Sequence, residues 1–246
     1  RSGDAGLPDG SLASNGTLNL SNKDDVYFAA AGGASTSGSA NGNKVNITAG
    51  QIVQTHDDGL RQITVGGLTF KNGEVYGGIS KTGNAASNEV TITGGTIGGE
   101  IYGGYTASNG DAELNKVTVS ADSGTIAAVT GGYANAGNAS SNDVTITNGT
   151  IGGTAYGGYT KSGSADGNSV TISGGSFNNK NIYGGYVAAG TGSASANRVS
   201  VDADTAANIA NVYGGYTVGS GGASSNDVKV AGDVSGTVAC GYAAGG

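Results

Sequence analysis

The chain has 246 residues, of which 50 are glycine, one is proline and only 12% are charged. Its formal net charge is −7 and it has no basic patch, so the electrostatic footprint of a nucleic-acid-binding protein is missing. No stretch approaches the roughly 20 apolar residues of a membrane-spanning helix. Glycine without a Gly-X-Y period excludes collagen, and a single cysteine excludes an internal disulfide.

In chain order, the first 74 residues are the least regular part. Alternating apolar residues at 17–20 and 26–28 predict a first coil, and residues 45–48 predict a second strand. Residues 49–70 fit the later spacing poorly, which predicts a distorted coil with a protruding loop at 54–60. We therefore expect two parts, an irregular cap-like segment at 1–74 and regular repeats at 75–246.

A repeat unit begins at Val75 with a box of one apolar residue followed by Tyr-Gly-Gly-Tyr. Later boxes follow at intervals of 26 to 30 residues and begin at Ile101, Val129, Ala155, Ile182, Val212 and Val238. Each box is followed by a Gly/Ser/Ala/Asn stretch, an Asn with an alternating strand, and a short segment bounded by glycines. Three short strands per repeat, all with period two, predict an all-β fold: a parallel β-solenoid of eight or nine coils.

The alternation predicts which side chains face the interior. Val90 and Ile92 share one parity, and their equivalents in later repeats are also β-branched and apolar, so we expect them inside. Thr91 and Thr93 have the other parity and are expected outside, whereas Ile97 of the third strand is expected inside. In the box, strict alternation places the second tyrosine inside, because Ile79 takes that position once.

The same alternation places the first tyrosine of the box outside. These residues are predicted to form a surface aromatic column that binds a ligand or packs against a neighbouring rod. The alternative is a self-stacked ladder that only stiffens the coils. The column consists of Tyr76, Tyr102, Tyr156, Tyr183 and Tyr213.

An asparagine precedes the second strand in every repeat. Side-chain amides at turns bond neighbouring backbone groups, and stacked copies form a ladder along the axis. We interpret these residues as structural rather than as ligands for a bound molecule. They are Asn43, Asn88, Asn115, Asn142, Asn168, Asn197 and Asn226.

Catalytic constellations are hard to build from this composition. His56 is the only histidine, so neither a serine hydrolase nor a zinc site has enough partners. His56-Asp57-Asp58 is either a metal or carbohydrate contact or a solvated turn, and Asp202 with Asp204 is either a carboxylate pair or a surface variation. Cys240 is either a reactive thiol or a small, partly buried residue. We expect no enzyme, no cofactor and no metal.

The repeated unit at 88–105, Asn-x-Val-Thr-Ile-x-Gly-Gly-Thr-Ile-Gly-Gly-x-Ile-Tyr-Gly-Gly-Tyr, resembles the repeats of autotransporter-type surface adhesins. The resemblance covers about residues 75–242. It implies a right-handed β-helix, secretion to the surface of a Gram-negative bacterium, and an adhesive or fibrous role. The sequence departs from the family pattern because no membrane barrel follows Gly246, which predicts a passenger fragment, a processed product or another kind of subunit.

Several functions compete at this point. The first is an extracellular adhesin passenger or stalk, whose partner is a host or bacterial surface glycan or protein. The second is a filament subunit that stacks head to tail on itself through open strand edges. Two minor alternatives are a carbohydrate-active enzyme, by analogy with other β-helices, and an ice-binding protein, suggested by the threonine columns. We expect neither nucleic-acid binding nor membrane insertion of this segment.

Overall fold

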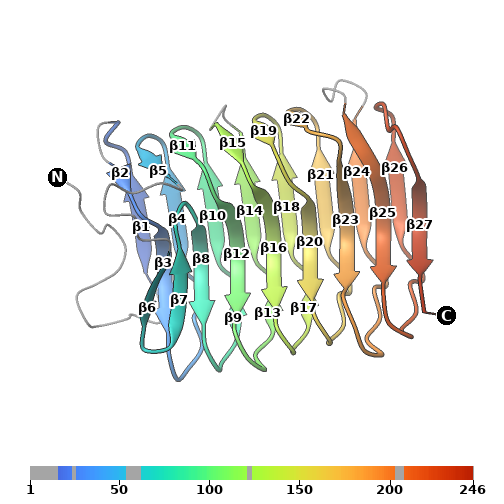
Figure 1. Ribbon diagram of the computed structural model, residues 1–246, viewed down its shortest axis with the longest axis horizontal. Coiled ribbons are helices and arrows are strands. Elements are labelled where there is room, and N and C mark those ends of the chain that lie inside the picture. The colour runs from blue at the N-terminus through green and yellow to red at the C-terminus, as the bar shows by residue number, and fades with distance from the viewer. Residues whose placement is uncertain (1–15, 24–25, 54–61, 121–123, 203–207, 246) are drawn as a thin grey trace.

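The computed structural model describes residues 16–23, 26–53, 62–120, 124–202 and 208–245. These residues form an all-β parallel solenoid of about eight turns, with about 27 residues per turn and no helix. Figure 1 shows the turns stacked side by side from β1 to β27. The predicted fold class is confirmed, and the described glycine-rich segments form the bends between strands.

Two eight-stranded parallel sheets form the long walls of the rod. The threonine sheet is ordered along the axis as follows: β1 (Thr17–Leu20), β4 (Lys44–Ile47), β10 (Glu89–Ile92), β14 (Lys116–Val119), β18 (Asp143–Ile146), β21 (Ser169–Ile172), β24 (Arg198–Val201) and β26 (Asp227–Val230). The tyrosine sheet is ordered in the same way: β3 (Ala30–Ser35), β8 (Val75–Ser80), β12 (Glu100–Thr106), β16 (Ala128–Ala134), β20 (Ala155–Thr160), β23 (Lys180–Val187), β25 (Ile209–Thr217) and β27 (Val238–Ala243).

Two-residue strands close the coils at the corners. They form three three-stranded sheets. The first contains β2 (Val26–Tyr27), β5 (Gln51–Ile52) and β11 (Thr96–Ile97), and the second contains β15 (Thr125–Ile126), β19 (Thr150–Ile151) and β22 (Ser176–Phe177). The third contains β9 (Ala85–Ala86), β13 (Ala112–Glu113) and β17 (Ala139–Ser140). The pairings between the described coils are parallel and in register, apart from one register shift between Lys180 and Ile182 where β23 pairs with β25. Equivalent residues therefore stack in columns.

The interior is a continuous apolar column, as the alternation predicted. Val90, Ile92 and Ile97 are fully buried, and the equivalent Val, Ile and Phe side chains of the next four coils are buried with them. Val228 and Val230 of the last coil are only partly buried. Burial of β-branched columns is the main apolar contribution to stability, because each coil covers the interior of its neighbour.

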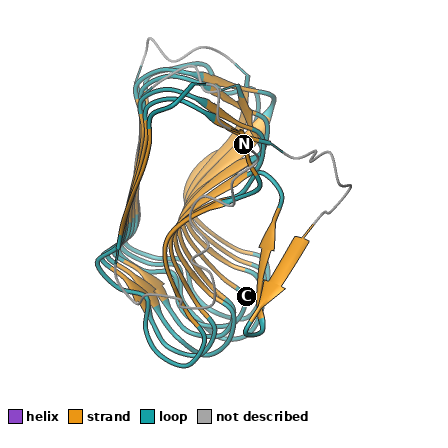
Figure 2. Cartoon of the chain, turned by 90° about the vertical axis from the view of Figure 1, so that its left-hand side faces the viewer, coloured by secondary structure: helices purple, strands orange, loops and turns teal. Residues whose placement is uncertain are grey.

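The N-terminal part is more regular than the sequence predicted. Strands β1, β3 and β4 join the two long sheets in register with the later coils. Among the described residues of this part, the element that departs from the repeat is an antiparallel hairpin between β5 and β8, formed by β6 (Gln62–Val65) and β7 (Leu68–Lys71). The hairpin lies on the outer side of the tyrosine sheet (Figure 2). The predicted loop at 54–60 lies outside the described residues.

Candidate functional site: the tyrosine face

The glycine pair of each box interrupts the alternation of the tyrosine sheet. A Cβ atom placed on Gly103 would lie 3.0 Å from the Cβ of Asn115, and one on Gly104 would lie 2.4 Å from the Nδ2 of Asn115. Both positions therefore point into the rod, although they are consecutive. Two consecutive inward positions require a bend, and only glycine fits so close to the opposite wall.

The bend places both tyrosines of each box on the outer face. The prediction that the second tyrosine faces inward is therefore wrong, because the pleat shifts by one residue at the glycine pair. In β12 the inward position after the pair is taken by Thr106, which is 0% exposed and donates a hydrogen bond to the carbonyl of Gly110. The rings of Tyr102 and Tyr105 meet edge to face with centroids 5.2 Å apart. Residues three apart in a straight strand are roughly 10 Å apart, so this face is concave.

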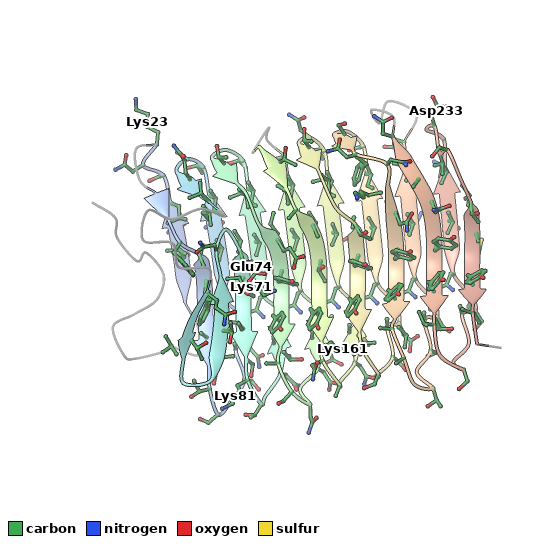
Figure 3. The ribbon with its side chains drawn as sticks, in the orientation of Figure 1. Lys23, Lys71, Glu74, Lys81, Lys161 and Asp233 are labelled. Atoms are coloured by element: carbon green, nitrogen blue, oxygen red, sulfur yellow. The ribbon has the colours of Figure 1, made fainter. Side chains whose placement is uncertain are left out.

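Eleven of the chain's 12 tyrosines lie on this face in two columns. Within a column, neighbouring rings are stacked with centroids 4.6 to 5.4 Å apart. Ring side chains repeat from coil to coil along the rod in Figure 3. The first column contains Tyr76, Tyr102, Tyr156, Tyr183 and Tyr213, and the second contains Tyr105, Tyr133, Tyr159, Tyr186, Tyr216 and Tyr242.

The stacking determines which part of each ring meets the solvent. Parallel rings at a spacing of about 5 Å overlap face to face, because an aromatic ring is too wide to lie flat beside its neighbour at the strand spacing. The ring faces are therefore covered by neighbouring rings, which makes the face a poor platform for stacking sugar rings. Tyr76, Tyr102 and Tyr183 of the first column are buried, whereas the tyrosines of the second column are partly exposed or, at Tyr242, exposed.

The hairpin covers the N-terminal end of the tyrosine face. Leu68 and Phe70 are buried against Tyr76, Ile79 and Tyr102, and the ring of Phe70 meets that of Tyr76 edge to face at 5.7 Å. Ile79 is thus buried under the hairpin rather than inside the rod. The sequence contained a signal for this element, because Gly66-Gly67 separates two alternating runs at the length of a two-residue hairpin turn.

Carboxylates accompany the tyrosines at this end. The hydroxyl of Tyr76 donates to the Oε2 of Glu74, and that of Tyr102 donates to the Oε2 of Glu100. Glu74 is 3% exposed and pairs with Lys71, whose Nζ lies 3.4 Å from the Oε1 of Glu74 (Figure 3). Burial lowers the pKa of Lys71, but Glu74 and Glu100 outweigh it and raise that pKa overall.

Toward the C-terminal end of the tyrosine face, asparagine amides take the place of these carboxylates beside the first tyrosine column. The Nδ2 of Asn181 donates to the hydroxyl of Tyr183 at 2.9 Å, and the Nδ2 of Asn211 donates to the Oδ1 of Asn181 at 2.8 Å. The backbone N–H of Thr237 continues this row by donating to Asn211. A polar row thus runs beside the first tyrosine column, acidic at the hairpin end and neutral at the other.

Burial raises the pKa of nine tyrosines of the face: Tyr76, Tyr102, Tyr105, Tyr133, Tyr156, Tyr159, Tyr183, Tyr186 and Tyr216. The pKa of Tyr76 is well above its usual value because of burial and the nearby Glu74 charge, and burial raises the pKa of Tyr183 to about 12. A raised pKa favours the neutral phenol in the folded state. Stability from these groups is therefore complete below the ordinary tyrosine pKa of about 10 and is lost as the pH rises above it.

We expect the native protein to resist tyrosine ionisation. At a pH of about 10.5, more than half of the tyrosines of a denaturant-unfolded sample should be ionised, whereas the native sample should show clearly fewer. Tyrosinate absorbance measures the ionisation, and circular dichroism measured in parallel should show unfolding beginning in the same alkaline range. Superimposable titration curves for native and unfolded protein would contradict the buried, neutral tyrosine columns.

The asparagines form a buried ladder inside the rod. The Oδ1 of Asn142 accepts hydrogen bonds from the backbone N–H and the Nδ2 of Asn115, at 3.0 and 2.9 Å. The same pattern links the coils from Asn43 to Asn226. Each Asn also packs against the glycine pair of its own coil. From Asn88 onward these side chains are bonded to the chain itself, whereas the buried Oδ1 of Asn43, at the N-terminal end of the ladder, has no partner among the described residues.

Of the remaining candidates, only Asp202 and Cys240 lie within the described residues. His56, Asp57, Asp58 and Asp204 lie outside the described residues, and Asp202 and Cys240 lie on different coils. Cys240 is exposed on β27. Within the described ranges, no group of three or more His, Cys, Asp and Glu side chains is placed to hold a metal ion. In the same part of the chain, no helix could cross a membrane.

The threonine columns lie on the outer face of the threonine sheet. The side chains of Thr91, Thr118, Thr145 and Thr171 are partly exposed and stack in register. A second column includes Thr93, two residues after Thr91. In this column the hydroxyl of Thr147 donates to the carbonyl of Val119 in the preceding coil at 3.4 Å. This face is regular and flat (Figure 2), but it carries no aromatic side chain.

Comparison with known proteins identifies no relative of the chain. No protein-family model matches the chain, and neither the curated proteins nor the solved structures contain a match.

Proposed function

We propose that the chain is an extracellular structural or adhesive scaffold whose contact surface is the tyrosine face. The observation that supports this proposal is the concentration of eleven tyrosines on one concave outer face. Five or more consecutive coils carry this face beyond the hairpin, so it is long enough to contact an extended partner. Tyrosine side chains provide large contact areas at a low cost in conformational entropy, and their hydroxyls hydrogen-bond readily.

A surface protein or glycan is the proposed partner. The partly exposed second tyrosine column and the row of Asn181, Asn211 and Thr237 suit a partner with many hydrogen-bonding groups. Because the ring faces are covered, recognition would depend on edges and hydroxyls rather than on stacked sugar rings. An adhesin passenger on a Gram-negative cell surface is the finer form of this proposal, and it rests on the resemblance of the repeats.

Changing the tyrosine face tests the proposal directly. A triple variant with Tyr159, Tyr186 and Tyr216 replaced by Ser should reduce binding to a responsive cell type or glycan at least about tenfold, since it removes the central contact area. The matched control replaces Thr118, Thr145 and Thr171 by Ser on the opposite wall, and binding should be unchanged. Equal binding by both triple variants would refute the tyrosine face as the contact surface.

A second candidate is a filament subunit that stacks head to tail. Among the described strands, β26 pairs only with β24 and β27 only with β25, and Val238 of β27 is 47% exposed. A further coil in the same register would cover these groups. Negative-stain electron microscopy should then show long uniform fibres at high protein concentration. Short rods at every concentration, or fibres that persist with Lys229→Pro in β26, would contradict stacking through this end.

A further inference from the structure

The tyrosine rings form an unbroken series of contacts along the rod. Starting at Tyr242, the second column reaches Tyr105 through stacked pairs whose centroids are never more than 5.4 Å apart. Tyr105 then meets Tyr102 and Tyr76 at 5.2 and 5.8 Å. The path crosses six coil steps, which is about 29 Å.

The path has a single narrow point. In the coil of β16, the first column carries Thr130 instead of tyrosine, so Tyr133 is the only tyrosine of that coil. Its ring lies 4.6 Å from Tyr105 and 5.0 Å from Tyr159. Every described ring contact between the two ends of the face therefore passes through Tyr133. By contrast, Tyr156 lies beside the path, because Tyr159 and Tyr186 contact each other without it.

One end of the path is equipped to accept protons. Phenols lose an electron readily only if the hydroxyl proton leaves with it, and a base within hydrogen-bond distance can take that proton. Glu74 and Glu100 are in this position for Tyr76 and Tyr102, whose rings are also stacked on each other at 5.3 Å. Both tyrosines are buried, with exposed fractions of 2% and 6%, so a radical there is shielded from the medium.

We propose that the tyrosine face conducts oxidising equivalents from its C-terminal end to a radical trap at Tyr76 and Tyr102. A high-potential one-electron oxidant, such as a peroxide-derived radical, takes one electron from an exposed ring such as Tyr242. The phenolic proton of that ring goes to water. In each further step the radical ring takes an electron and a proton, and the neighbouring ring becomes the neutral radical. In the last step the Tyr105 radical takes an electron from Tyr102 or Tyr76 and a proton from water, which restores its phenol. The phenol proton of the newly oxidised ring passes to the hydrogen-bonded Oε2, that of Glu100 for Tyr102 and that of Glu74 for Tyr76.

This activity is independent of the proposed scaffold role, because it needs no partner at the face. The exposed Cys240, the only cysteine, lies two residues before Tyr242 on β27 and provides a place to attach the oxidant at this end of the path. A ruthenium polypyridyl photosensitiser attached there, with a cobalt(III) ammine as irreversible electron acceptor, generates the oxidant in a laser flash. Transient absorbance and electron paramagnetic resonance then measure the yield and lifetime of the tyrosyl radical.

The labelled protein should show a long-lived radical. Tyr133→Phe keeps the ring but not the oxidisable phenol, so it should lower the long-lived yield at least about tenfold, whereas Tyr156→Phe should change it less than about twofold. Circular dichroism and thermal melting verify that each variant is folded. An unchanged long-lived yield in Tyr133→Phe would refute conduction along the face.

The trap has its own test. Replacing Tyr76 and Tyr102 together by Phe should abolish the long-lived radical and leave only short-lived ones. Glu74→Gln combined with Glu100→Gln retains a hydrogen-bond acceptor but removes the base, so it should shorten the lifetime. A lifetime that neither pair of changes alters would refute the trap.

Discussion

Asn142→Ala is expected to lower the free energy of unfolding by about 4 kcal/mol, because three buried groups lose their partners at roughly 1–3 kcal/mol each. Asn142 is 1% exposed. Without its Oδ1, the backbone N–H and one Nδ2 hydrogen of Asn115 lose their acceptor, and without its Nδ2 the carbonyl of Ala112 loses a donor 2.9 Å away. Chemical denaturation followed by circular dichroism measures the change.

The matched control is Asn109→Ala, which removes the same atoms from an exposed turn. Its free energy of unfolding should change by less than about 0.5 kcal/mol. If both variants lose equally little stability, the ladder contributes no more than surface asparagines, and the coils are held together by apolar burial and backbone pairing alone.

Gly131→Ala is expected to be similarly damaging, by about 3 kcal/mol, because the added methyl group has no space in a packed wall. A Cβ at this position would lie 2.4 Å from the carbonyl oxygen of Gly157 and 2.9 Å from the Cβ of Asn142. The first of these is a backbone atom, so a side-chain rotation cannot relieve the clash. The variant should unfold at a lower denaturant concentration than the unmodified protein.

Gly222→Ala is the matched control, since a Cβ there would meet no atom within 4 Å. It should leave the unfolding midpoint nearly unchanged. Tyrosine exposure provides a second measurement: a strand that can no longer bend at Gly131 should also separate Tyr133 from its stacked neighbours and lower its raised pKa. Equal midpoints for the two alanine variants would contradict the close packing of the glycine pair.

These two predictions concern one contact, which explains why the repeat contains both features. The glycine pair of each coil makes room for the asparagine that follows it, and the asparagine carries the hydrogen bonds between coils. The bend that results also brings the two tyrosines of the box together on the outside. The glycine pair of the Tyr-Gly-Gly-Tyr box therefore serves both the interior, where it makes room for the asparagine, and the outer face, where it brings the two tyrosines together.

The solenoid, its repeat length and its apolar columns could be predicted from the sequence. Period-two alternation identifies which of Val90, Thr91 and Ile92 face inward, since neighbouring side chains in a regular strand point to opposite faces. Repetition then extends the result to every coil. The first tyrosine column was also predicted on the outside for this reason.

Alternation fails where the strand is no longer regular. Strict alternation carries no information about a bend, so it placed Tyr105 inside, and the position of Ile79 supported the error. Only the tertiary structure shows that two consecutive glycines face Asn115 and that Ile79 is covered by Phe70 of the hairpin. The hairpin of β6 and β7 is not part of the repeated unit, so its contacts with Ile79 cannot be derived from the repeat pattern.

The backbone conformation of the residue before each ladder asparagine likewise depends on contacts between coils rather than on local preference. Ser87, Leu114, Ser141, Ala196 and Ser225 all have φ between 56° and 57°, in the left-handed region that such residues avoid. Local preference disfavours this conformation by about 1–2 kcal/mol per residue. It persists because it directs the next N–H to the asparagine of the adjacent coil. The sequence alone thus determined which side chains repeat, whereas the stacking of complete coils determined where the chain bends and which faces those side chains share.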